Sequence, residues 1–331
     1  MMAEPLSIQI PATAPFPSAV RYAELAEELG FESINCSHIA GRDSFTVLSA
    51  LAMRTERVRL GTAVAPIHHR SPASMAQTAA TVDELSGARF RLGLGTGHRS
   101  TMGDWHGQQI GDPVREMREY VALVRAILAG STPPRGERWN STFSFMGFSP
   151  RPDIPILLAG LSPSMLRLAG EIADGVLLWA CPSDYVRDVV VPEVTRGRRR
   201  VGRSLEGFAI MPGIPSAVGG DRAAMLDGVR NELHRYFGLP FYRAMFERAG
   251  FGGDVAAYDA APDREEQKRA IGEEFIDRLC AIGDEAAVRA GIARYRDAGA
   301  TNPVITAVWG TEFEPTLRAA ARTAEESALL A

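Results

Sequence analysis

The chain has 331 residues, of which 46% are hydrophobic and 23% are charged, and its formal net charge is −4. This composition is that of an ordinary globular protein, and the lack of a basic excess argues against a nucleic-acid partner. No apolar run reaches the roughly 18 residues that a membrane span needs, so we expect no membrane segment.

Three cysteines, Cys36, Cys181 and Cys280, are odd in number and far apart in the sequence. This usage fits a reducing cytoplasm better than a disulfide framework. The first residues lack both the basic region and the apolar core of a signal peptide. We therefore expect a cytoplasmic protein.

Lysine occurs once, as Lys268, in a charged helical segment that we expect to be exposed. Schiff-base aldolases, pyridoxal enzymes and P-loop ATPases all need a lysine in the active site. The sequence therefore argues against these three classes.

Short apolar runs typical of buried parallel strands recur along the chain, each followed by an amphipathic run typical of a helix. We expect the first helix to end at Gly30 and the third to begin at Pro72, behind a Ser71 cap. The eight strand runs span residues 7–10, 31–38, 58–67, 89–95, 154–160, 175–181, 207–214 and 302–308. Eight strands in strict alternation with helical segments favour one closed (β/α)8 TIM barrel domain over 1–331 rather than an open, doubly wound sheet.

Such a barrel needs about 250 residues, so this chain has a surplus. We place the surplus in a hairpin near 131–150 and in a helical insertion near 218–280. The aromatic residues of the helical insertion either cover the pocket as a lid or form a small core of their own: Tyr236, Phe237, Phe241, Tyr242, Phe246 and Phe251.

Three glycines, Gly93, Gly95 and Gly97, close the fourth strand run in the sequence GLGTG. The dinucleotide fingerprint has a different spacing, G-x-G-x-x-G, and runs directly into a helix. Residues 98–104 are too polar and glycine-rich to predict a packed helix there. In a barrel, this strand end instead belongs to the active-site rim, where glycines let a flat ring approach closely.

Polar residues gather at the predicted carboxyl ends of the strands, where barrel enzymes carry their active sites. His38 and His98 hold such positions and are our candidate catalytic residues. His68 and His69 are adjacent, so we expect at most one of them to face the site. With His106 they place five of the six histidines on one rim, but the H-x-H pattern of hydrolytic metal barrels is missing, so we expect no metal. A G-x-S-x-G elbow is also missing, which argues against a serine hydrolase.

Three blocks of the sequence carry a family resemblance: GTAVAPIHHRSPASMAQTAATVDELSGARFRLGLGTG, PILLAGLSPSMLRLAGEIADGVLLWACPSDYV and IARYRDAGATNPVI. They occur in the order found in the bacterial-luciferase-like flavin oxidoreductases, and they most resemble the branch that uses the deazaflavin coenzyme F420. The resemblance implies a (β/α)8 barrel and is loose only over 220–280.

The resemblance also implies roles for residues at the strand ends. His38, in a Ser37-His38 pair, matches the catalytic histidine of deazaflavin-dependent sugar-phosphate dehydrogenases. His98 stands where those relatives have an acid in G-T-G-E, so their mechanism and substrate do not carry over directly. The residues implied to bind the cofactor are Ser37, the Ala63-Val64-Ala65 bulge with its non-proline cis peptide, Gly95, Thr96, Gly97, the phosphate-loop residues Ala159, Gly160 and Leu161, and Trp179.

The leading hypothesis is hydride transfer between C5 of coenzyme F420 and a small organic substrate, with His38 as acid or base and His98 polarising the substrate. The alternatives are an FMN-dependent two-component monooxygenase and a non-catalytic flavin or ligand carrier. Trp105 is a candidate pocket wall. The resemblance also implies a homodimer.

Overall fold

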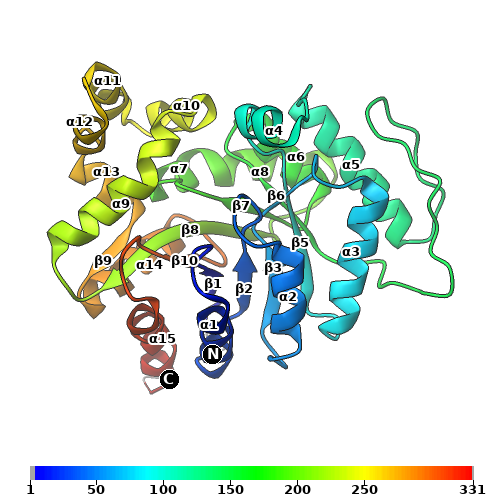
Figure 1. The fold of residues 1–331 in the computed structure, drawn as a ribbon, viewed down its shortest axis with the longest axis horizontal. Coiled ribbons are helices and arrows are strands. Elements are labelled where there is room, and N and C mark those ends of the chain that lie inside the picture. The colour runs from blue at the N-terminus through cyan, green and yellow to red at the C-terminus, as the bar shows by residue number, and fades with distance from the viewer. Residues whose placement is uncertain (1–3, 330–331) are drawn as a thin grey trace.

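The computed structural model describes residues 4–329, with side-chain detail to residue 321. Eight parallel strands close into a barrel in the order β1, β2, β3, β5, β6, β7, β8, β10, and β10 pairs with both β8 and β1 (Figure 1). The predicted TIM barrel is confirmed. The strands are β1 Ser7–Ile10, β2 Ser33–Cys36, β3 Arg59–Thr62, β4 Ala65–Pro66, β5 Phe90–Gly95, β6 Ile156–Ala159, β7 Gly175–Leu178, β8 Ala209–Val218, β9 Ala281–Gly283 and β10 Val304–Ala307.

Helices cover the outside of the barrel and one of its ends. They are α1 Phe16–Glu28, α2 Ser44–Ala52, α3 Pro72–Leu85, α4 Arg99–His106, α5 Pro113–Leu128, α6 Pro163–Ile172, α7 Ser183–Tyr185, α8 Val191–Arg200, α9 Arg222–Phe237, α10 Pro240–Arg248, α11 Gly252–Ala260, α12 Arg264–Arg269, α13 Glu273–Leu279, α14 Glu285–Asp297 and α15 Phe313–Leu329, with a π-helical turn at Val186–Val190. Local signals read from the sequence are confirmed: Gly30 has φ +79° after α1, and Ser71 caps α3 ahead of Pro72.

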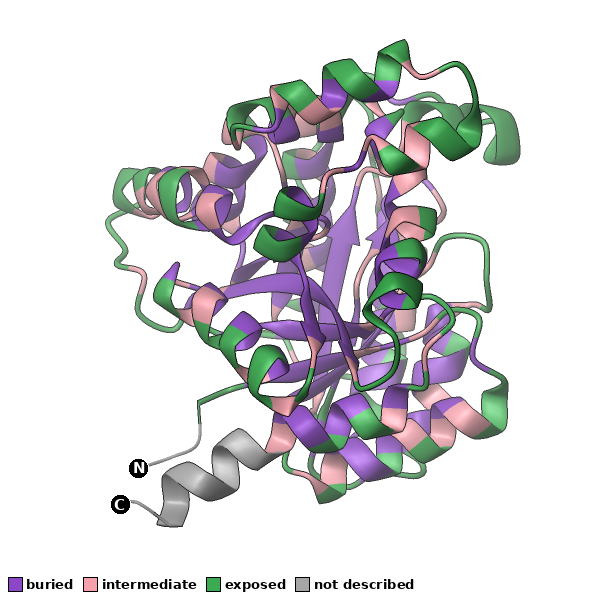
Figure 2. Cartoon of the chain, turned by 90° about the vertical axis from the view of Figure 1, so that its left-hand side faces the viewer, coloured by how far each residue is buried: buried purple, intermediate pink, exposed green. Residues whose placement is uncertain are grey.

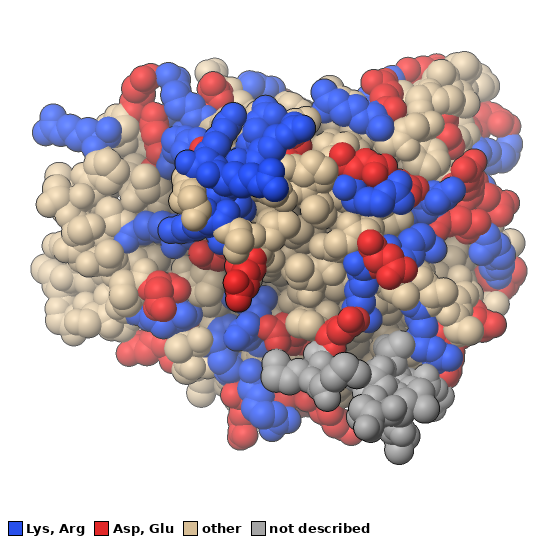
Figure 3. Space-filling view, turned by 180° about the vertical axis from the view of Figure 1, so that it is seen from behind, with Lys and Arg blue, Asp and Glu red and all other residues tan. Residues whose placement is uncertain are grey.

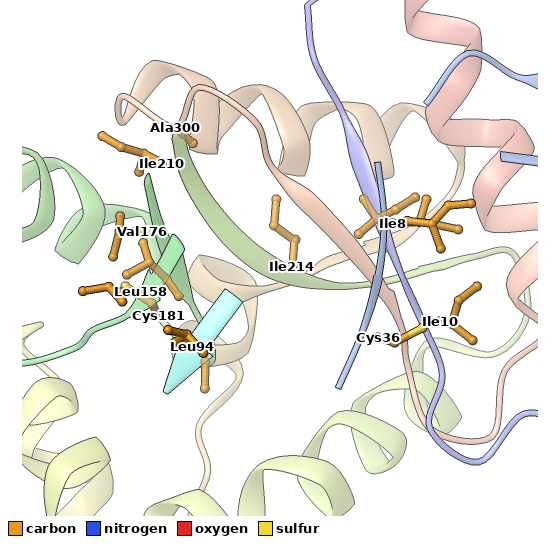
Figure 4. Packing of buried hydrophobic residues seen from close by; sticks show 14 of the residues in the cluster. Ile8, Ile10, Cys36, Leu94, Leu158, Val176, Cys181, Ile210, Ile214 and Ala300 are labelled. Atoms are coloured by element: carbon orange, nitrogen blue, oxygen red, sulfur yellow. The ribbon is translucent and has the colours of Figure 1, made fainter. Parts of the chain in front are cut away.

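The core lies in two places because successive residues of a strand face opposite sides. The larger cluster fills the space between the strands and the helices and includes Ile8, Leu94, Leu158 and Ile214 (Figure 4). Most strand residues are buried, whereas exposed residues line the outer faces of the helices (Figure 2). A smaller cluster inside the barrel consists of Leu157, Leu177, Met211 and Val304.

The outer surface carries charges of both signs. Figure 3 shows Lys and Arg interspersed with Asp and Glu over the face seen from behind, with one gathering of basic side chains. This mixture agrees with the small net charge of −4.

The hairpin predicted near 131–150 is wrong. The segment runs out from α5 and back to β6 (Figure 1), but it contains no strand, and one backbone hydrogen bond, from Gly136 N–H to Trp139 O at 3.2 Å, joins residues within it. Pro133 and Pro134 have no N–H to donate to a strand ladder. The partly buried aromatic rings of the segment pack on the main core and hold it in place.

The prediction that no packed helix follows Gly97 is also wrong, since α4 begins at Arg99. Gly97 has φ +74° and turns the chain, and Met102 packs against it. The sequence hides this helix because α4 buries little besides Thr101 and Met102, so it has no apolar periodicity.

The helical insertion predicted near 218–280 is observed as α9 to α13, and the sequence missed β9, which extends the sheet beside β8. Of the two proposed uses of its aromatic residues, the core of its own is observed, and the lid over the pocket stays a prediction. Phe237, Phe246 and Phe275 form a core of their own, with ring centroids 4.6–5.3 Å apart. Tyr236 and Tyr242 instead approach residues at the carboxyl end of the barrel.

Candidate functional site

The carboxyl ends of β3 and β5 form a tight backbone support. The Ala63–Val64 peptide bond is cis, as predicted, and lies between β3 and β4. A Cβ placed on Gly95 would lie 2.5 Å from Cγ2 of Val64 and 3.6 Å from Cβ of Ala159. The glycine therefore lets the Val64 bulge lie directly against β5.

One inward-facing layer lies at the carboxyl end of the barrel. It follows from the inner cluster, because the residue two positions further along each strand faces the same side. These residues are Ala159 after Leu157, Trp179 after Leu177, Gly213 after Met211 and Thr306 after Val304. Most of them are small, and the absence of a side chain at Gly213 lets the Trp179 indole pack directly against β8.

Two polar atoms in this layer are buried. The hydroxyl Oγ1 of Thr306 has no hydrogen-bond partner among the described residues. The indole Nε1 of Trp179 forms no well-aligned hydrogen bond there either, although it lies near the Tyr236 hydroxyl and opposes the rise of the Tyr236 pKa. Buried polar groups are nearly always satisfied, so these two call for a ligand or a water molecule. The edge of the Trp179 indole contacts the backbone at Gly213, and the Tyr236 ring lies edge-on to it at 6.0 Å.

His38 follows β2 and is held by the start of α2. The backbone N–H of Ser44 donates to His38 Nδ1 at 3.3 Å, so the proton of the neutral ring lies on Nε2. The Ser44 hydroxyl lies 3.0 Å from the same nitrogen. Burial lowers the pKa of His38, and the nearby Arg70 and His106 lower it further, whereas Asp43 opposes the shift.

Four histidines line one side of the site around a cavity of about 520 Å³. The ring of His69 lies between those of His38, at 5.3 Å, and His106, at 4.1 Å. Its Nε2 is buried without a partner, and burial, together with the neighbouring imidazoles and Arg70, lowers the pKa of His69 to about 4. His68 also borders the cavity, but its side chain has no exposed surface and is turned to Thr96 and Glu116, which agrees with the expectation that at most one of the two adjacent histidines faces the site.

His68 forms a buried pair with Glu116 of α5. Its Nδ1 donates to the carbonyl oxygen of Thr96 at 3.2 Å, and its Nε2 lies 3.0 Å from Glu116 Oε2. The other carboxylate oxygen, Oε1, accepts the Gly111 N–H at 3.1 Å. Both ring nitrogens of His68 therefore face acceptors, and the pair ties β5 to α5 behind the cavity.

His98 belongs to a different group of contacts from His38. It precedes α4, and its ring lies 5.8 Å from that of Tyr242 in the helical insertion. Burial lowers the pKa of His98, and Arg235 lowers it further. The two predicted catalytic histidines thus stand on different parts of the rim.

The other residues predicted from the sequence to bind the cofactor or to wall the pocket lie in several different environments. Gly160 N–H donates to Leu177 O at 3.4 Å, so this predicted phosphate donor has a protein acceptor, and Leu161 O accepts the Tyr185 hydroxyl at 2.8 Å. Ser37 lines a small separate cavity of about 30 Å³. Trp105 is 53% exposed and lies beneath the Arg235 guanidinium rather than in a pocket wall.

Comparison with known proteins identifies the family of this chain. The family model of luciferase-like monooxygenases matches residues 3–302. The chain belongs to this family. It is 30% identical over 315 residues to a Mycobacterium tuberculosis protein whose provisional name is a coenzyme F420-dependent oxidoreductase, covering 86% of this chain and 90% of that protein.

Two solved structures of proteins with different cofactors have a fold similar to that of this chain. The coenzyme F420-dependent tetrahydromethanopterin reductase of Methanopyrus kandleri superposes with a TM-score of 0.84 at 22% identity, covering 99% of both chains. The type II Baeyer–Villiger monooxygenase component from Pseudomonas putida, in complex with FMN, gives 0.71 at 18% identity, covering 98% of both chains. These likenesses establish the fold. Membership of the family makes the chain an enzyme of the luciferase-like oxidoreductases.

Within the described residues no group of side chains has the arrangement of a metal site, and none of the helices is both long and apolar enough to cross a membrane. All three cysteines are buried and unpaired.

Sequence reasoning missed the arginines of the cavity, Arg42 and Arg70, and the amide of Gln108. The sequence HHR showed Arg70 beside the histidines, but no pattern tied it to Asp43, which its Nη2 contacts at 2.6 Å.

Proposed function

We propose that the protein is a coenzyme F420-dependent oxidoreductase that transfers a hydride between the deazaflavin C5 and a small organic substrate. The observation that carries this proposal is the inward layer at the barrel mouth, where Trp179 and Thr306 stand among small residues and their buried polar atoms lack a well-aligned hydrogen bond among the described residues. A flat heterocycle with carbonyl and N–H groups would supply partners for both atoms. The provisional name of the Mycobacterium tuberculosis relative supports the choice of coenzyme.

The residues that would hold the coenzyme come from both sides of the layer. Ala63, Val64 and Ala65 would support one face of the ring, and the Gly95-Thr96-Gly97 turn would border it. On the other side Ala159, Gly160, Leu161 and Trp179 follow β6 and β7. Leu161 and the start of α6 remain our candidate for the phosphate, since a helix N-terminus favours an anion.

His38 would exchange the proton that accompanies the hydride. The Ser44 N–H occupies the lone pair of Nδ1, so the neutral ring carries its proton on Nε2. The lowered pKa of His38 leaves the ring neutral near pH 7, so Nε2 faces the substrate as a hydrogen-bond donor and proton source toward a carbonyl or an imine. His98, on a different part of the rim, would polarise the substrate.

The test is an anaerobic assay with purified protein, in which the absorbance of oxidised F420 is followed against a panel of alcohols, aldehydes and imines. Substrate-dependent reduction or reoxidation of F420 supports the proposal. Failure with every substrate class, in protein that remains folded, would contradict it.

The second candidate is an FMN-dependent two-component monooxygenase. It is favoured by the fold similarity to the FMN-bound Pseudomonas putida enzyme. Oxygen uptake with reduced FMN, and none of the F420-linked absorbance change, would establish this function instead.

A further inference from the structure

The cavity beside His38 has an unusual lining. Besides the histidines it is bordered by Arg42, Arg70 and Gln108, and the side chain of His68 is itself fully buried behind it. Asp43 is the one acidic residue among the described residues that line it. The balance of formal charge in the lining is therefore positive even when every imidazole is neutral.

The single carboxylate is already satisfied by other groups. Asp43 Oδ1 accepts from the Thr46 N–H at 2.8 Å and from the Thr46 hydroxyl at 3.0 Å, while Oδ2 accepts from Arg70 at 2.6 Å. It caps α2 and orients Arg70, so it offers little acceptor capacity to a ligand.

Donors, by contrast, remain available to a ligand. A guanidinium carries five N–H donors. Arg42 directs Nη1 to the carbonyl oxygen of Ala14 at 2.7 Å, and Arg70 directs Nη2 to Asp43, so each has further N–H groups. The buried, unpartnered Nε2 of His69 adds a third group that a ligand could satisfy.

We propose that this cavity binds an anionic group, a carboxylate or a phosphate, of the substrate, and thereby places the substrate against His38. The proposal rests on the proposed oxidoreductase function for the identity of the reaction, but the binding it describes does not depend on the coenzyme. Arg70, stacked over the Phe45 ring at 4.7 Å and held by Asp43, is preorganised to receive the anion.

The anionic tail of the coenzyme is the competing source of the same chemistry. The candidate tail site follows β6, and β3 and β5 stand between β6 and β2, the strand that His38 follows, so we assign the cavity to the substrate.

The experiment follows the imidazole ¹H–¹³C signals of the whole protein by NMR while inorganic phosphate or malonate is added. The expected result is saturable shifts of the His38, His69 and His106 signals with at least one of the two anions. The signal of His234, which bonds Gln267 in the helical insertion, is the internal control and should not move. Shifts with phosphate alone would indicate a phosphate group on the substrate, and shifts with malonate alone would indicate a carboxylate.

Arg70→Gln and, separately, Arg42→Gln should weaken this binding by about tenfold or more, the loss expected for a charge-assisted contact. Arg42 does not contact the helix cap, so its variant separates binding from folding. Arg54→Gln is the matched control, since Arg54 pairs with Glu24 beyond the opposite end of α2 and should leave binding unchanged.

Absence of saturable shifts, or shifts that both arginine variants leave intact, would overturn the proposal. The coenzyme arm compares F420 with a deazaflavin that lacks the phosphate tail. If the arginine variants weaken only F420, the cavity holds the coenzyme tail and the proposal is wrong. Failure of the F420 turnover assay alone would leave the anion-binding result standing, so the two failures are distinguishable.

Discussion

The two sides of the barrel mouth differ in the chemistry of the residues that line them. After β6, β7 and β10 the inward layer is small or aromatic, with Ala159, Trp179 and Thr306 as its members, and its few buried polar atoms lack a well-aligned hydrogen bond among the described residues. After β2, β4 and β5 the lining is imidazole, guanidinium and carboxylate; the Asp43 carboxylate there already has partners, whereas the arginines keep further N–H groups. The first side suits a flat ring, and the second suits proton transfer and an anion.

The difference shows that one barrel mouth can recognise a ligand by shape on one side and by charge on the other. The apolar side needs shape, because a ring is recognised by the space that small residues leave and by a few donors. The histidine side needs charge and orientation, which long-range contacts such as His68 to Glu116 provide. Substitutions on the two sides should therefore fail in different ways.

Replacing His38 by Ala should have the largest effect on catalysis. Turnover should fall by about 10²- to 10⁴-fold, the contribution typical of a positioned acid–base group, while coenzyme affinity stays the same. Steady-state kinetics and a coenzyme titration on the same sample separate the two quantities. His234→Ala is the matched control, and full activity in H38A would remove the histidine from the mechanism.

Glu116→Ala should have the largest effect on stability. It leaves His68 buried without its partner, which for a buried pair costs about 3–5 kcal/mol of unfolding free energy. The exposed Arg54–Glu24 pair gives the control, because Glu24→Ala should cost about 1 kcal/mol or less. Urea denaturation measures both, and equal losses would show that the histidine side is not held by this pair.

Gly213→Ala should damage the apolar side. Its Cβ would lie 2.9 Å from the Trp179 indole, so the ring must move, and overpacking of this kind costs about 1–3 kcal/mol. We expect coenzyme binding to weaken by about tenfold or more, whereas the anion-dependent shifts on the histidine side remain. Gly253→Ala in α11 meets no atom within 4 Å and serves as the control. Loss of both coenzyme binding and the anion-dependent shifts in G213A would show that the two sides do not bind their ligands independently.

The pH response of His69 should be the smallest effect. Burial, followed by His106, His38, Arg70 and His68, lowers the pKa of His69 from 6.5 to about 4 in the folded protein. The unfolded chain therefore binds more protons between these values, and His69 makes stability fall as pH drops from 6.5 toward 4. An NMR titration should find a midpoint near 4, and His69→Gln should flatten the stability loss in that window. A midpoint near 6.5 would contradict the burial of this ring.

The sequence predicted the barrel well because its signal is local: apolar strand runs, Ser71 before Pro72 and Gly30 after α1 are all read within a few residues. The hairpin failed because alternating aromatic residues in 131–150 pack on the core without strand pairing. Helix α4 was missed because a short exposed helix lacks periodicity.

The site was predictable only in part, for a physical reason. Strand-end position located His38 and His98, but contacts between distant segments decide their surroundings. Arg70 meets Asp43 and His68 meets Glu116 across 27 and 48 positions, and no spacing rule anticipates such pairs. The functional roles of the site residues stay predictions until they are measured.

The most direct test of the central claim is a fluorescence titration of the protein with F420 and with FMN, repeated on Trp179→Phe and on Trp309→Phe as the exposed control. We predict saturable tryptophan quenching by F420 and not by FMN, reduced in amplitude in W179F and unchanged in W309F. Preference for FMN, or F420 quenching that W179F leaves intact, would contradict the assignment of the coenzyme to this side of the barrel.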